Sequence, residues 1–82
     1  MHLWVYVLQS VYDKTHYVGY AKDVATRLQE HNFGRCRYTK GHRPWKIVYQ
    51  EAATSRSEAM KRERFWKSGV GRQELKKLLV NT

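Results

Sequence analysis

The alternation of apolar and polar positions predicts three β-strands in this chain. Residues 3–8 form a β-branched and aromatic run with the length of a buried strand. A turn at residues 10–14 separates them from a second strand at residues 15–19, and this short connection favours a hairpin. A third strand is expected at residues 45–51, after a basic, glycine-containing loop at residues 35–44.

Helical periodicity follows the hairpin. Asp23 is a suitable N-cap for a helix that ends near Asn32, with Val24 and Leu28 on its buried face. Gly34 then acts as a stop signal. This helix is expected to cover one face of the sheet.

A second helix is expected over residues 57–67. Ser55 or Ser57 would cap it, and Gly69 and Gly71 would break it. A last amphipathic helix would then start at residue 73. Its expected end is Val80, and its expected inward-facing residues are Leu75, Leu78 and Leu79.

The predicted order of elements is therefore β-β-α-β-α-α. Strands joined by a short turn are antiparallel, so this order predicts an α+β fold with a three-stranded antiparallel sheet flanked by helices. The 82 residues are enough for one domain, residues 1–82, which buries only about 60% of its unfolded surface.

Charge indicates the class of partner. A formal net charge of +9 and a pI near 10.0 imply a polyanion. Nucleic acid fits better than a membrane surface, because the basic residues interleave with Tyr, Trp and Gly instead of forming one cationic amphipathic helix. A purely structural nucleic-acid binder would carry the same charge, so charge alone indicates no chemistry.

Several function classes are not expected. The single Cys36 excludes an internal disulfide, and no paired Cys and His spacing suggests a zinc site. No apolar run has the length of a membrane span, and no signal-peptide pattern follows Met1. A cytoplasmic location is the default expectation.

An acidic residue interrupts the apolar stripe of the second helix. Ala59, Met60 and Trp66 define that stripe, and Glu63 falls between them. A carboxylate in that place costs several kcal/mol unless it is paired, hydrogen-bonded or bound to a cation. Glu63 therefore either pairs with a nearby arginine at the rim of the core or holds a cation.

Two tyrosines lie on predicted strands. A period of two puts Trp4, Tyr6 and Leu8 on one face of the first strand, and Tyr17 shares a face with Gly19 on the second. Gly19 leaves room for a ligand or another backbone. The phenols are either core aromatics or reactive groups whose pKa a nearby positive charge lowers.

The first helix offers such a charge. Arg27 and His31 are one turn apart and flank the apolar stripe. Arg27 is either a solvated side chain or a bidentate phosphate ligand, and His31 could carry a proton or hydrogen-bond to the same site.

These segments together resemble the GIY-YIG nuclease superfamily, and within it the small single-domain bacterial proteins. Trp4-Val5-Tyr6 stands at the first family motif and Tyr17-Val18-Gly19 at the second. Residues 21–28 resemble the segment that carries the family's arginine. His31-Asn32 and residues 38–41 are similar to the single-domain branch, and residues 57–63 match the helix that bears the metal-binding glutamate. The five matches keep the family's order over nearly the whole chain.

The resemblance implies roles for five residues. Tyr6 would be the general base near the attacking water, and Tyr17 would position that water or the scissile phosphate. Arg27 would neutralise the phosphate, and His31 would support the site. Glu63 would hold one Mg²⁺ or Mn²⁺. The implied activity is a metal-dependent endonuclease that hydrolyses DNA phosphodiester bonds, with repair or recombination as the pathway by analogy.

The chain departs from the family pattern twice. Trp4 takes the place of the leading glycine of the first motif, which is a common relaxation. Tyr20 follows Gly19 where the excision-repair relatives have a lysine, so the resemblance implies no second basic group at that position. Lys22 is nearby, but it is not assigned that role.

A binding module without catalytic activity is the alternative function. A basic and aromatic mixture of this kind clamps phosphates and stacks on bases. The expected nucleic-acid contacts are Lys22, Arg35, Arg37, Tyr38, Lys40, Arg43 and Lys67. RNA is not distinguished from DNA at this level. Exposed aromatics, for which Phe33, Trp45 and Phe65 are candidates, would serve a base stack or a partner protein that supplies specificity.

Overall fold

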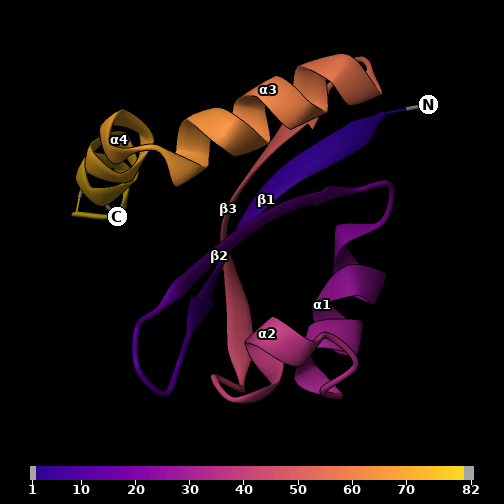
Figure 1. Ribbon diagram of the computed structural model, residues 1–82, viewed down its shortest axis with the longest axis vertical. Helices are drawn as coiled ribbons and strands as arrows, with labels where there is room; N and C mark the ends of the chain where they lie inside the picture. Colours follow the sequence, from indigo (N-terminus) through magenta and orange to yellow (C-terminus); the bar gives the residue numbers. More distant parts are fainter. Residues whose placement is uncertain (1, 81–82) are drawn as a thin grey trace.

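The computed structural model describes residues 2–80. Three strands form an antiparallel sheet in the order β2-β1-β3. Helices α1 and α2 lie on one side of the sheet, and α3 and α4 lie on the other (Figure 1). The elements are β1 Leu3–Ser10, β2 His16–Ala21, α1 Val24–Asn32, α2 Arg37–Lys40, β3 Trp45–Ala53, α3 Arg56–Lys67 and α4 Gly69–Val80. The α+β fold with a three-stranded antiparallel sheet is confirmed.

The central strand β1 supplies side chains to both layers. Val5 and Val7 are fully buried on the α3 side, where they pack with Trp66 of α3. Tyr6 and Leu8 alternate with them and are buried on the α1 side. This alternation is the strand period of two, so the face predicted for Tyr6 is correct.

Local signals start two helices at the expected residues. The Asp23 carboxylate accepts the backbone N–H of Thr26 at 3.1 Å at the start of α1. Ser55, the first of the two predicted caps, accepts the N–H of Glu58 at 3.1 Å at the start of α3. Each cap satisfies a backbone donor that the helix itself leaves unpaired.

Helix α4 begins four residues earlier than predicted, and the two glycines do not precede it. Gly69 is its first residue, and Gly71 lies inside it. A Cβ at Gly71 would sit 2.0 Å from the Phe65 carbonyl oxygen, so only glycine lets the first turn of α4 pack against the end of α3. The glycine that predicted a break therefore permits a close helix contact.

The segment predicted as a loop at residues 35–44 contains the short helix α2. Trp45, expected among the exposed aromatics, is only 3% exposed, and its indole N–H donates to the Thr39 carbonyl at 2.9 Å. The side-chain amide of Asn32 brackets the Trp45 backbone, accepting its N–H at 2.7 Å and donating to its carbonyl at 3.2 Å. These bonds fix α1 and α2 relative to β3.

Two apolar positions were assigned to the wrong face. Met60 is 45% exposed, although Ala59 and Trp66 are buried as predicted. Leu78 is 38% exposed, whereas Leu75 is buried. Both exposed residues lie on the outer layer, which has only solvent beyond it. Within residues 2–80, no helix has both the length and the apolar character that a membrane crossing requires.

Candidate active site

The two predicted tyrosines meet across the β1–β2 ladder. Tyr6 pairs with Gly19, and a Cβ at Gly19 would lie 2.7 Å from the Tyr6 hydroxyl oxygen. The space that Gly19 leaves is therefore filled by the phenol of Tyr6, not by a ligand or another backbone. The ring centroids of Tyr6 and Tyr17 are 6.4 Å apart, so both phenols belong to one cluster.

His31 is buried between these rings. It is 0% exposed, and its ring centroid lies 4.8 Å from that of Tyr17. Its Nε2 is 3.2 Å from the Tyr6 hydroxyl, and its Nδ1 is 2.8 Å from Thr39 Oγ1. The helix α1 thus places a histidine in hydrogen-bond contact with a phenol of the central strand.

The hydrogen bonds of Thr39 assign the tautomer of His31. The Thr39 hydroxyl donates to the Cys36 carbonyl at 3.3 Å, so its oxygen is free to accept the Nδ1–H of His31. The Nε2 lone pair then accepts the hydroxyl proton of Tyr6. Burial, followed by the positive charge of Arg27, lowers the pKa of His31. The ring is therefore a neutral proton acceptor at neutral pH.

Burial decides the acidity of the phenols. It raises the pKa of Tyr6 to about 12, and the neighbouring Tyr17 adds to this effect. The charge of Arg27 acts in the opposite direction but is smaller. Burial also raises the pKa of Tyr17. The expectation that a positive charge brings these pKa values down toward neutrality is wrong.

Arg27 and Glu63 approach Tyr17 from different helices. Arg27 lies within α1, its side chain is 40% exposed, and it pairs with Glu30 at 2.8 Å. Its charge lowers the pKa of Tyr17, whereas the charge of Glu63, from α3, raises it. Both helices reach Tyr17 because it lies on the edge strand β2. The structure thus brings Tyr6, Tyr17 and His31 into contact, and the charges of Arg27 and Glu63 act on Tyr17.

Glu63 lies at the margin of the core and not within it. Its side chain is 26% exposed, and it accepts a hydrogen bond from Lys67 at 3.2 Å. The partner is thus a lysine one turn away, and not the arginine that one interpretation of the sequence invoked. Lys67 is 54% exposed, so this pair is weak and exchangeable.

The donor set at Glu63 suits a hard divalent cation. No group of three or more His, Cys, Asp or Glu side chains in the described chain could surround a metal. Mg²⁺ is usually bound by only one or two protein carboxylates, and water molecules complete its coordination shell. It does not need a site in which every ligand comes from the protein. A partly exposed carboxylate with one mobile lysine partner fits that behaviour.

Most of the predicted nucleic-acid residues lie on or beside α2. Arg35, Arg37, Lys40 and Arg43 are exposed on or beside α2, and the Arg43 Nε–H is bound to the Lys40 carbonyl at 2.9 Å. Tyr38 is 59% exposed and lies against Tyr17, with ring centroids 5.9 Å apart. Lys67 is the Glu63 partner, and Lys22 is exposed between β2 and α1.

Two residues of this cluster were not singled out from the sequence as site residues. Thr39 orients His31, as described. Burial, followed by the charge of Cys36, raises the pKa of Tyr17. Burial also raises the pKa of the Cys36 thiol itself, but hydrogen bonds from the backbone of α2 and the charge of Arg27 act against it, and the net pKa is lowered. Both contacts join segments distant in sequence, so no local pattern marks them.

Comparison with known proteins agrees with this arrangement. The GIY-YIG catalytic domain family matches residues 2–76. A UPF0213 protein of Staphylococcus epidermidis is 49% identical over 65 residues, which cover 78% of this chain and 79% of the relative. A UPF0213 protein of Staphylococcus aureus is 48% identical over 61 residues, or 73% of each chain.

A solved structure extends the agreement to the fold. The solution NMR structure of a UPF0213 protein from Bacillus halodurans is 34% identical and superposes with a TM-score of 0.57. The alignment covers 95% of this chain and 85% of that one. The chain described here belongs to the GIY-YIG catalytic domain family and, within it, to the small bacterial UPF0213 proteins.

Proposed function

We propose that this protein is a divalent-metal-dependent endonuclease that hydrolyses phosphodiester bonds in DNA. One observation carries the proposal: Tyr6, Tyr17 and His31 pack into one cluster, and the charges of Arg27 and Glu63 act on Tyr17. Membership of a catalytic domain family supports the same reaction class. The net charge of +9 supports a polyanionic substrate.

Arg27 is proposed to bind the scissile phosphate. Its guanidinium has five N–H donors, and the Glu30 pair uses one of its nitrogens, Nη1. The remaining donors are available for two phosphate oxygens in a bidentate arrangement. The fixed charge would then stabilise the negative charge that grows on the non-bridging oxygens as water attacks.

Tyr6 and His31 are proposed to take up the proton of the attacking water. A phenol with a pKa of about 12 is protonated at neutral pH and needs an acceptor before it can act as a base. His31 Nε2 is that acceptor, at 3.2 Å. As the O–H bond of water breaks, its proton moves to the Tyr6 oxygen and the phenolic proton moves to His31. The hydroxide electrons form the new bond to phosphorus, the P–O bond to the leaving oxygen breaks, and that oxygen takes up a proton from solvent.

Tyr17 is proposed to orient the substrate. Its raised pKa keeps its hydroxyl protonated, so it can donate a hydrogen bond to a phosphate oxygen or to the water. The charges of Arg27 and Glu63 both act on Tyr17, which fits a hydroxyl that contacts both the phosphate and the hydration shell of the cation. Tyr17 is half-buried and accessible from the edge of the sheet.

Glu63 is proposed to hold Mg²⁺ or Mn²⁺ after Lys67 moves away. A bound cation there would supply Lewis-acid stabilisation of the phosphate and of the leaving oxygen. With a single carboxylate ligand, affinity for the metal in the absence of DNA is expected to be weak. Once a cation replaces it at Glu63, the Lys67 ammonium would be available to contact a phosphate of the substrate.

The test compares Glu63→Gln with the wild type on single-stranded, duplex and branched DNA in Mg²⁺, Mn²⁺ or EDTA. Glu74→Gln is the matched control, because Glu74 is an exposed carboxylate on α4. We expect the wild type and Glu74→Gln to nick DNA only with metal, and Glu63→Gln to be inactive while retaining its DNA affinity in EDTA. If wild type and Glu63→Gln cut equally, Glu63 is misassigned. If the wild type binds tightly without cutting in any metal, the protein is a binding module.

A further inference from the structure

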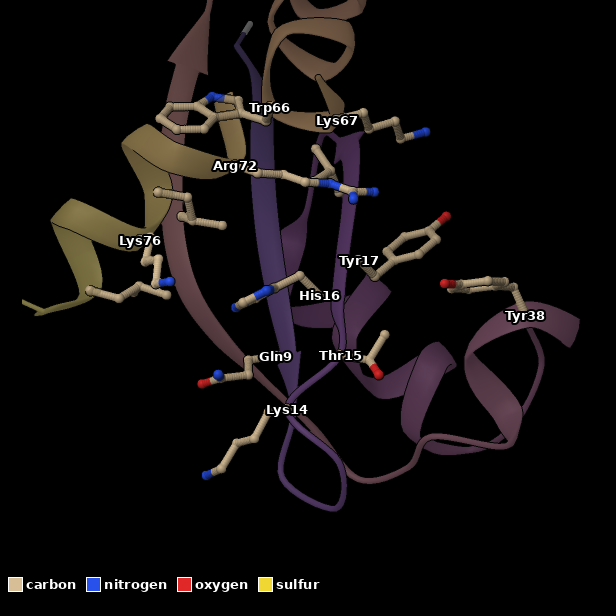
Figure 2. A pocket seen from close by; sticks show the side chains of 13 residues that line it. Gln9, Lys14, Thr15, His16, Tyr17, Tyr38, Trp66, Lys67, Arg72 and Lys76 are labelled. Carbon is tan, nitrogen blue, oxygen red and sulfur yellow. The ribbon is translucent and has the colours of Figure 1, made fainter. Parts of the chain in front are cut away.

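A groove of about 870 Å³ runs along the free edge of β2, and neither Tyr6 nor His31 lines it. One wall is formed by α4 and the end of α3, and the other by the start of β2 and by Tyr38 (Figure 2). The lining residues are Gln9, Lys14, Thr15, His16, Tyr17, Val18, Tyr38, Trp66, Lys67, Arg72, Leu75, Lys76 and Leu79.

The groove combines an apolar floor with cationic walls. Val18, Trp66 and Leu75 provide buried apolar surface. Lys14, Lys67, Arg72 and Lys76 provide four positive charges, and none of the lining residues in the described chain is acidic. A polyanion with apolar parts matches this lining better than an apolar peptide does.

Arg72 and Lys76 are aligned along the groove. They are four residues apart on α4, so they lie one turn apart on the same face of the helix. Burial, followed by the positive charge of Arg72, lowers the pKa of His16 on the opposite wall, so His16 is a neutral hydrogen-bonding group there. The two α4 side chains therefore give a row of positive charge that faces β2.

One end of the groove opens at the candidate active site. Tyr17 and Tyr38 line both the groove and the phenol cluster, with ring centroids 5.9 Å apart. Lys67 lines the groove and also binds Glu63. Figure 2 shows Tyr17 and Tyr38 next to each other among the lining side chains, so a strand whose phosphate sits beside Tyr17 could continue into the groove.

We propose that the groove between α4 and the edge of β2 binds the sugar–phosphate backbone of the nucleic-acid strand on one side of the scissile phosphate. Arg72 and Lys76 contact successive phosphates, and the apolar floor packs against sugars or bases. A second copy of this chain is a poorer occupant, because it would bring another net charge of +9 into a cationic groove. The place of the scissile phosphate rests on the proposed function, whereas the binding itself does not.

The experiment measures binding in EDTA, where no cleavage can interfere. Fluorescence anisotropy of a fluorescein-labelled DNA strand, alone or annealed to its complement, is followed over a range of salt concentrations. The groove variant is Arg72→Ala with Lys76→Ala. The control is Arg56→Ala with Lys61→Ala, which removes one arginine and one lysine from exposed positions of α3 outside the groove.

We expect the groove variant to lose about tenfold in affinity and the control to lose less than about threefold. Loss of two phosphate contacts lowers the salt slope by about 1.4 on a single strand and by about 1.8 on a duplex. The charge-preserving variant Arg72→Lys with Lys76→Arg should restore the slope, which separates lost charge from a disturbed fold.

Equal losses in the groove variant and the control, or no loss in either, would overturn the groove assignment. Failure of the two proposals is distinguishable, because only one of them concerns cleavage. If the wild type never cuts but its binding depends on Arg72 and Lys76, the groove assignment holds and the nuclease proposal fails. If the protein cuts but its binding does not depend on these residues, the nuclease proposal holds and the groove assignment fails.

Discussion

On the α1 side of Tyr17, His31 and Thr39 are fully buried and joined in a chain of hydrogen bonds that ends on Tyr6. On the α3 side, Glu63 and Lys67 form a pair that water reaches, with side chains 26% and 54% exposed. Breaking the buried hydrogen bonds of His31 costs much free energy, because no water can replace a lost partner there. The Glu63–Lys67 pair can exchange partners at little cost in free energy, because water reaches both side chains.

This difference matches what each side is proposed to do. A proton acceptor works best when its tautomer and distance are fixed before the substrate arrives, and the buried bonds of His31 fix both. A carboxylate that takes a hydrated cation, together with a lysine that takes a phosphate, must instead be accessible. We therefore expect substitutions on the buried side to cost stability as well as activity, and those on the exposed side to affect mainly ligands.

The largest effect is expected for Tyr6→Phe. It removes the hydroxyl that would relay the proton of water and leaves the buried Nε2 of His31 without its donor. We expect cleavage to fall by about 10²–10⁴-fold and the free energy of unfolding to fall by about 1–3 kcal/mol. Single-turnover cleavage and urea denaturation measure the two effects.

Tyr12→Phe is the control for Tyr6→Phe, because Tyr12 is 77% exposed and lies in the hairpin turn. It should match the wild type in both measurements. Wild-type cleavage by Tyr6→Phe would remove Tyr6 from the mechanism. Lost activity with unchanged stability would argue that the Tyr6–His31 bond contributes nothing to the fold.

Thr39→Val should have the next largest effect. It removes the acceptor of the His31 Nδ1–H while keeping the shape of the side chain. We expect about 1–3 kcal/mol of destabilisation and about a tenfold lower kcat with little change in KM, because the tautomer is no longer fixed. Thr39→Ser restores the hydroxyl and should restore both values.

Nitrogen NMR of the imidazole separates the role of Thr39 from a simple packing role. In the wild type, Nδ1 should carry the proton and Nε2 should be the acceptor. Thr39→Val should shift the population toward the other tautomer. An unchanged spectrum together with lost kcat would mean that Thr39 acts through packing alone.

The motif residues could be selected from the sequence because their order and their positions on elements are local properties. Tyr6 faces the α1 side because strands alternate, and the Asp23 cap sets where α1 begins. Glu63 stood out because it interrupts an apolar stripe. The structure brings these residues together, whereas their chemical roles remain predictions.

The features that were missed depend on partners far away in the sequence. α3 ends at Lys67 as the two glycines predicted, but the contact of Gly71 with the end of α3 allows α4 to begin at Gly69 instead of at residue 73. Trp45 is buried by its bonds to Asn32 and Thr39, which no periodicity indicates. The phenol pKa values were misjudged because the degree of burial is set by packing on both sides of the sheet and outweighs one nearby charge.

Acidification should have a smaller effect, and it should come from the buried side. Folding lowers the pKa of His31 below 6.5, so the unfolded chain takes up a proton that the folded chain refuses. The stability contributed by the neutral ring is complete above pH 6.5 and is lost as the pH falls through the folded pKa. One such group gives a slope of at most about 1.4 kcal/mol per pH unit.

Urea denaturation between about pH 8 and pH 5 measures this slope. The pKa of His16 is also lowered, so the comparison is made in a His16→Ala background, with and without His31→Gln. The slope should persist in His16→Ala and shrink when His31 is replaced. For the same reason the acid limb of the cleavage profile should lie below pH 6.5. A slope that is independent of His31 would contradict the buried, neutral assignment.

Lys67→Met should have the smallest effect on the fold, and it is the sharpest test of the exposed side. The Glu63 pair is accessible to water, so we expect less than about 0.5 kcal/mol of destabilisation. A cation at Glu63 then has no lysine to displace, so half-maximal cleavage should need less Mg²⁺ than in the wild type. The loss of one phosphate contact should weaken DNA binding in EDTA and lower its salt slope by about one. A fall in stability as large as that of Thr39→Val would mean that both sides of Tyr17 are equally rigid, and the division between a fixed proton acceptor and an exchangeable ligand site would be lost.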